Sequence, residues 1–85
     1  MDDVRDPRPR VVLYGRVGCH LCHDARSALE QVAAQSGERF AEVDIDTDPA
    51  LRERYSDLVP VVTVDGTEQG HWHIDPARVL AALNR

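Results

Sequence analysis

Lysine is absent from this sequence of 85 residues, which also has few features of nucleic-acid-binding, membrane or secreted proteins. Its 10 cationic residues are all arginines and stand against 15 Asp and Glu residues, which gives a formal net charge of −5. Because the arginines are scattered and form no basic face, this composition excludes sequence-independent binding to nucleic acid. The longest apolar run is Val11–Tyr14, whereas a membrane-spanning helix needs about 20 apolar residues. We expect no nucleic-acid or membrane partner.

The first residues also lack the hydrophobic stretch of a secretory leader. Residues 1–9 combine Asp, Arg and two prolines without a periodic apolar pattern. We expect a flexible N-terminal segment over residues 1–9 and a single domain over residues 10–85. A cytoplasmic location is expected for this chain. Since no large exposed apolar patch is evident, we also expect a monomer.

The remaining residues alternate between strand-like and helix-like apolar patterns. Strands are predicted over residues 10–14, 39–46, 61–64 and 67–72, and helices are predicted to begin near Cys19, at Asp48-Pro49 and at Asp75-Pro76. Gly37 is placed to end the first helix, Asp65-Gly66 is a hairpin signal, and Trp72 is expected to pack against the last helix. The expected fold class is α/β, in the order β-α-β-α-β-β-α, with a four-stranded mixed sheet flanked by helices.

Only two cysteines are present, Cys19 and Cys22, three positions apart. A disulfide across so short a loop adds little stability, so the pair indicates chemistry or metal binding. Cys19 falls at the start of the predicted helix, where unpaired N–H groups and the helix dipole stabilise a thiolate. We expect Cys19 to be the exposed attacking sulfur and Cys22 the buried resolving sulfur of an exchange through a mixed disulfide. Cations nearby in the sequence are Arg16, His20 and His23.

A Cys-x-x-Cys motif beside a strand–helix–strand pattern is the signature of a thioredoxin-like redox site. The chain resembles a small glutaredoxin-like member of the thioredoxin superfamily over residues 10–84. The resemblance is carried by the stretch from Tyr14 to Cys22, by Val59-Pro60 before the third strand, and by Gly66 and Gly70. It implies that Pro60 is cis and packs opposite Cys19. It further implies a substrate or glutathione site formed by Tyr14, Arg16, Val59, Pro60 and Gly70.

The sequence departs from the usual glutaredoxin pattern at three places. His20-Leu21 replaces Pro-Tyr between the cysteines, Leu58 replaces the threonine before Val-Pro, and His71 replaces the second glycine of a Gly-Gly pair. The resemblance implies a thiol–disulfide oxidoreductase without a bound cofactor, which acts on a disulfide-containing protein or on glutathione, with glutathione as a candidate reductant. The alternative is a carrier that holds a metal or an iron–sulfur cluster on the same cysteines, with zinc ligands such as His71 and His73.

Overall fold

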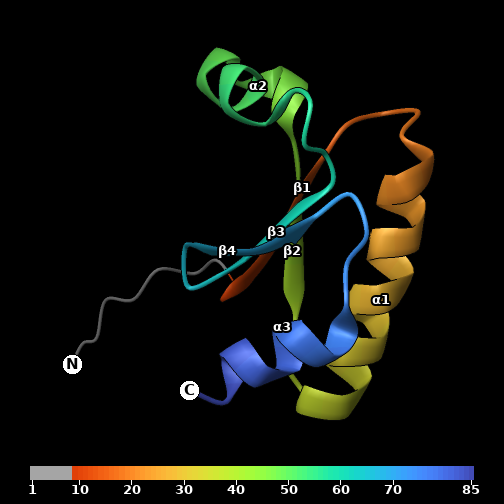
Figure 1. The fold of residues 1–85 in the computed structure, drawn as a ribbon, viewed down its shortest axis with the longest axis vertical. Helices are drawn as coiled ribbons and strands as arrows, with labels where there is room; N and C mark the ends of the chain where they lie inside the picture. The colour runs from red at the N-terminus through yellow and green to blue at the C-terminus, as the bar shows by residue number, and fades with distance from the viewer. Residues whose placement is uncertain (1–8) are drawn as a thin grey trace.

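Figure 1 shows the computed structural model of the protein, which describes residues 9–85. The strands are β1 (Val11–Gly15), β2 (Phe40–Asp44), β3 (Val61–Val64) and β4 (Thr67–His71). The helices are α1 (His20–Ser36), α2 (Pro49–Tyr55) and α3 (Pro76–Leu83), and a short 3₁₀ turn, η1 (Ile45–Thr47), follows β2. This order of elements confirms the predicted α/β fold class. The flexible segment predicted over residues 1–9 lies, except for Pro9, outside the described residues.

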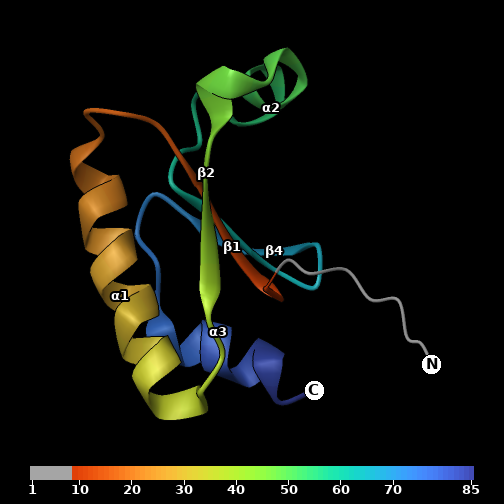
Figure 2. The same cartoon turned by 180° about the vertical axis from the view of Figure 1, so that it is seen from behind.

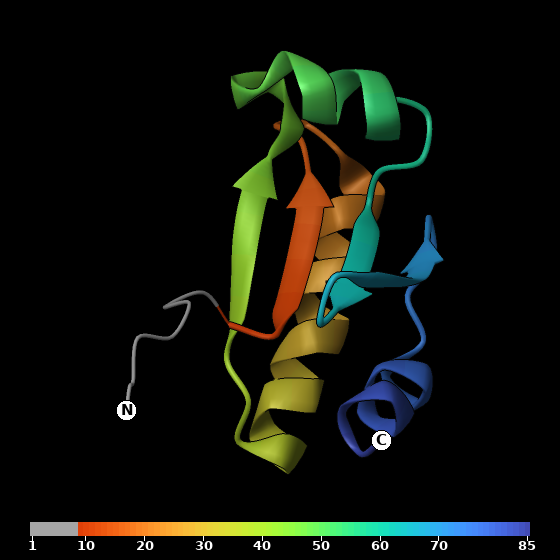
Figure 3. The same cartoon turned by 90° about the vertical axis from the view of Figure 1, so that its left-hand side faces the viewer.

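The four strands form one mixed sheet in the order β2-β1-β3-β4. β1 is parallel to β2 and antiparallel to β3, which is antiparallel to β4. The carboxyl ends of β1 and β2 and the amino end of β3 therefore meet at one edge of the sheet, next to α2 (Figure 3). The residues that follow β1 therefore lie close to the residues that precede β3.

The core has two parts, one on each side of the sheet. On one side α1 and α3 pack together against the strands (Figures 1 and 2), and fully buried Leu13, Leu29 and Val62 belong to this cluster. On the other side Tyr55 of α2 packs with Ile45 and Val61. Burying a large aliphatic side chain contributes about 1.5–3 kcal/mol, so these clusters hold the helices against the sheet.

Helix ends occur where the sequence predicts them. The carboxylate of Asp48 accepts the N–H of Ala50 at 2.9 Å, and the carboxylate of Asp75 accepts the N–H of Ala77 at 3.0 Å. A proline follows each of these capping residues, where its fixed φ suits the first helical position. Gly37 ends α1 with a φ of 79°, the left-handed conformation that glycine adopts without steric cost.

Two expectations about the elements are wrong. The second strand ends at Asp44 instead of Asp46, because the carboxylate of Asp44 accepts the N–H of Asp46 at 2.9 Å and begins the 3₁₀ turn. Trp72 does not pack against α3: its side chain is 50% exposed and its indole N–H donates to the carbonyl oxygen of Asp57 at 2.9 Å. Trp72 has a φ of 64°, which ends β4 and directs the indole over the loop before β3.

Within residues 9–85, no helix combines the length and the apolar character that crossing a membrane requires.

Candidate active site

The two cysteines lie at the start of α1 and are joined in a disulfide, with their Cα atoms 5.2 Å apart. Cys19 is the N-cap residue of α1, and its sulfur accepts the backbone N–H of Cys22 at 3.2 Å. Cys19 is partly exposed, whereas Cys22 is 3% exposed. The helix start therefore presents an N–H group to the Cys19 sulfur, and burial restricts access to the Cys22 sulfur.

Gly15, the last residue of β1, lies directly against the Cys22 sulfur. A Cβ atom placed on Gly15 would lie 2.8 Å from Cys22 Sγ, closer than a carbon and a sulfur can approach without displacement. The strand register pairs Tyr14 with Val61 and therefore places Pro60 beside Gly15. The Val59-Pro60 peptide bond is cis, as the resemblance implied. The cis-proline loop and the cysteines thus share one end of the sheet, while a contact of Pro60 with Cys19 stays a prediction.

Trp72 covers the loop that leads to Pro60, a feature that sequence reasoning missed. Its backbone N–H donates to the carbonyl oxygen of Pro60 at 2.9 Å, and its indole N–H reaches the carbonyl of Asp57. The rings of His71 and Trp72 meet edge-on, with their centroids 4.9 Å apart. These contacts fix an exposed aromatic surface beside the cis-proline. The only signal in the sequence is an aromatic residue directly after the strand that pairs with β3, the strand that follows Val59-Pro60.

The other residues that the resemblance implied are only partly brought together. Tyr14 is half-buried, with its ring 4.9 Å from that of Tyr55, and packs in the same apolar cluster as Val59. Tyr14 and Val59 therefore pack against the same buried residues, Ile45, Tyr55 and Val61. Gly70 lies further along β4, opposite Val62, where a Cβ would make only an ordinary 3.8 Å contact with Ile74.

Arg16, in the turn between β1 and α1, is paired with a carboxylate of its own chain. Its Nε donates to Asp46 Oδ2 at 3.2 Å and its Nη2 donates to Asp46 Oδ1 at 2.7 Å. These hydrogen bonds hold the pKa of the Asp46 carboxyl below its ordinary value and raise the pKa of Arg16. The negative charges of Asp44 and Asp57 also raise the pKa of Arg16. The cation predicted for the site is thus compensated by neighbouring acidic groups.

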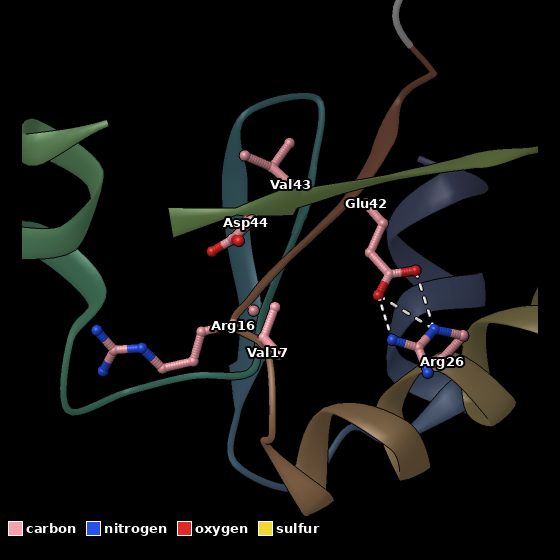
Figure 4. Close-up of a pocket in the computed structure, with 7 residues that line it drawn as sticks. Arg16, Val17, Arg26, Glu42, Val43 and Asp44 are labelled. Atoms are coloured by element: carbon pink, nitrogen blue, oxygen red, sulfur yellow. Dashed lines mark hydrogen bonds and ion pairs between the residues drawn. The ribbon is translucent and has the colours of Figure 1, made fainter. Parts of the chain in front are cut away.

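A shallow hollow of about 280 Å³ lies beside Gly15, on the β2 side of the site. Figure 4 shows that Arg26 and Glu42 form an ion pair on one side of it and that Arg16 extends away from this pair. Val17, at the rim, is 90% exposed. The hollow is lined by Gly15, Arg16, Val17, Arg26, Glu42, Val43 and Asp44.

Comparison with known proteins places this geometry in a family. The family model described as Glutaredoxin-like domain (DUF836) matches residues 10–84. The chain belongs to this glutaredoxin-like family. Its Cys-x-x-Cys pair at a helix start gives it a thiol redox role, which agrees with the site described above.

Solved structures similar to this glutaredoxin-like chain include two bacterial proteins. Protein Ne2328 from Nitrosomonas europaea has a TM-score of 0.75 at 31% identity, over 96% of this chain and 98% of that chain. Protein XcR50 from X. campestris has a TM-score of 0.70 at 38% identity, over 87% of this chain and 95% of that chain. Reduced Escherichia coli glutaredoxin, at 22% identity and a TM-score of 0.59 over 87% and 92% of the two chains, shares the thioredoxin-like fold.

The metal-carrier alternative requires further ligands beside the two cysteines. Within residues 9–85, no three or more His, Cys, Asp or Glu side chains are grouped so that they could hold a metal ion. His71, one of the candidate ligands, instead places Nδ1 2.9 Å from the carboxylate of Glu68.

Proposed function

We propose that this protein is a thiol–disulfide oxidoreductase that reduces polypeptide disulfides or mixed disulfides with glutathione. The observation that carries the proposal is the Cys19 sulfur at the first turn of α1, where it accepts the N–H of Cys22 at 3.2 Å. An N–H group directed at the sulfur stabilises the thiolate relative to the thiol. Cysteines in such positions have a pKa below the ordinary value of about 8.5.

In the proposed reaction the Cys19 thiolate attacks one sulfur of the substrate disulfide. A bond forms between Cys19 and that sulfur, and the other substrate sulfur leaves as a thiolate, which takes up a proton from water. Cys22 then loses its proton and attacks the Cys19 sulfur. The products are the Cys19–Cys22 disulfide and a second free substrate thiol, so two electrons pass from the protein to the substrate.

The burial of the two sulfurs supports this division of roles. Cys22 is 3% exposed and lies against Gly15, so an external disulfide meets the more exposed Cys19 first. With Cα atoms 5.2 Å apart, the two cysteines are within the range that a disulfide spans. Two molecules of an external thiol, with glutathione as the first candidate, would return the pair to the dithiol and would leave joined as their own disulfide. The reaction requires no resident cofactor.

The cis-proline loop is the proposed contact for the substrate backbone. Pro60 lies beside Gly15 at the sheet end, Val59 packs in the same apolar cluster as Tyr14, and the Pro60 carbonyl accepts the Trp72 backbone N–H. An extended substrate segment could pair with the backbone of Val59 while its sulfur faces Cys19. Arg16 is the permanent cation of the adjoining turn.

The test compares Cys19→Ser with Cys22→Ser on a disulfide-linked fluorescent peptide pair, with dithiothreitol as the reductant. When reduced Cys22→Ser is freed of dithiothreitol before the peptide pair is added, it should accumulate a mixed disulfide between Cys19 and one peptide, visible as an added mass, because the resolving step is lost. Cys19→Ser should form no adduct and reduce no peptide above the background rate. Unchanged peptide reduction by Cys19→Ser would overturn the proposal.

A further inference from the structure

Arg16, three residues before Cys19 in the chain, forms an ion pair with Asp46. Arg16 is the only permanent cation in the turn and first helical residues, 15–23. Its Nε and Nη2 both donate to Asp46, at 3.2 and 2.7 Å, in the paired geometry that gives guanidinium–carboxylate contacts their strength. An incoming carboxylate would therefore meet a guanidinium whose charge Asp46 already balances.

Further carboxylates surround this pair from two separate elements. Asp44 ends β2, and Asp57 lies in the loop after α2; both act on Arg16. Arg52 of α2 also acts on Asp46, but the chain as a whole has a net charge of −5. This group therefore comprises three carboxylates and two guanidiniums, which leaves a local net charge of −1.

We propose that Asp46 makes this site select disulfides flanked by basic or neutral residues over disulfides flanked by acidic groups. Among polypeptide substrates, the preferred class is then a disulfide next to Arg or Lys side chains. The proposal rests on the oxidoreductase function proposed above. The bonds formed and broken are those of that reaction, and Asp46 acts only on which substrate reaches Cys19.

The chain contains a matched control for Asp46. Arg10 and Asp65 form a second two-bonded pair, at 2.9 and 2.8 Å, between the start of β1 and the β3–β4 turn, at the opposite end of the sheet. Asp65→Asn removes the same charge from the same kind of pair. Asp65 has a φ of 52°, a left-handed conformation that asparagine adopts as readily as aspartate.

The experiment measures kcat/KM for two disulfide-linked peptides that are identical except that arginine or glutamate flanks the cysteine. At low ionic strength the protein should prefer the arginine peptide roughly tenfold, and 1 M salt should abolish the preference. Asp46→Asn should reduce the preference roughly fivefold, the effect of one charge at contact distance in water. Asp65→Asn should leave it unchanged, and Arg16→Gln should increase it.

The outcomes separate this inference from the function on which it rests. Reduction of neither peptide, or reduction that Cys19→Ser does not abolish, overturns the proposed function. Cys19-dependent reduction of both peptides at equal rates overturns only the charge selection. A preference that Asp46→Asn leaves intact, or that Asp65→Asn reduces equally, overturns the role of Asp46.

Discussion

Gly15 provides the sharpest test of how the strand end and the resolving cysteine fit together. In Gly15→Ala the new Cβ would lie 2.8 Å from Cys22 Sγ, and neither partner can move freely. Gly15 is paired with Asp44 of β2, and Cys22 is buried in the first turn of α1. Overpacking of this kind costs about 1–3 kcal/mol. For a domain of this size, each kcal/mol lowers the melting temperature by about 4–8 °C.

The assay is urea denaturation of Gly15→Ala in the presence of reductant, so that no disulfide contributes to stability. The same substitution is then made in a Cys22→Ala background, where the sulfur is absent. In that background, Gly15→Ala should change the free energy of unfolding by no more than about 0.5 kcal/mol. The double-mutant cycle should therefore give a coupling between positions 15 and 22 of about 1 kcal/mol or more. Gly70→Ala is the control, because its Cβ would make only 3.8 Å contacts. An equal cost of Gly15→Ala in both backgrounds would refute the contact as its cause.

Two further predictions concern stability away from the cysteines. Glu42 has a lowered pKa because it accepts hydrogen bonds from Arg26, so its contribution is present above its unfolded pKa and lost as the pH falls through the lowered folded value. Glu42→Gln should cost a few tenths to about 1 kcal/mol at pH 7, and this difference should vanish near pH 3 in urea titrations; a difference that persists there contradicts the reasoning. Asp75→Ala should cost about 0.5–2 kcal/mol, because the Ala77 N–H loses its cap. Asp24→Ala, an exposed change within α1, should stay within about 0.5 kcal/mol, and equal effects would contradict the capping role.

The elements that depend on local signals were predictable from the sequence. Asp48-Pro49 begins a helix because the carboxylate and the fixed proline φ both act within one turn. Asp65-Gly66 forms the hairpin because both residues tolerate positive φ, here 52° and 85°. Cys19 at the helix start followed from the same kind of local reasoning.

The features that were missed depend on residues distant in the sequence. Arg16 and Asp46 are 30 positions apart and meet because the parallel pairing of β1 and β2 brings their ends together. Trp72 turns from the expected position over α3 to the Asp57 carbonyl because β4 pairs with β3 and ends one residue earlier than predicted. Such contacts follow from strand register, which no apolar pattern specifies to the residue.

The central claim is that the helix start holds Cys19 as a thiolate near neutral pH, and its alkylation rate tests this most directly. In Cys22→Ser, Cys19 is the only thiol, and its reaction with iodoacetamide is followed by mass spectrometry from pH 4 to 10. We predict a half-maximal rate at a pH well below 8.5, the ordinary value of a free thiol. A half-maximal rate at or above about 8.5 would contradict the account.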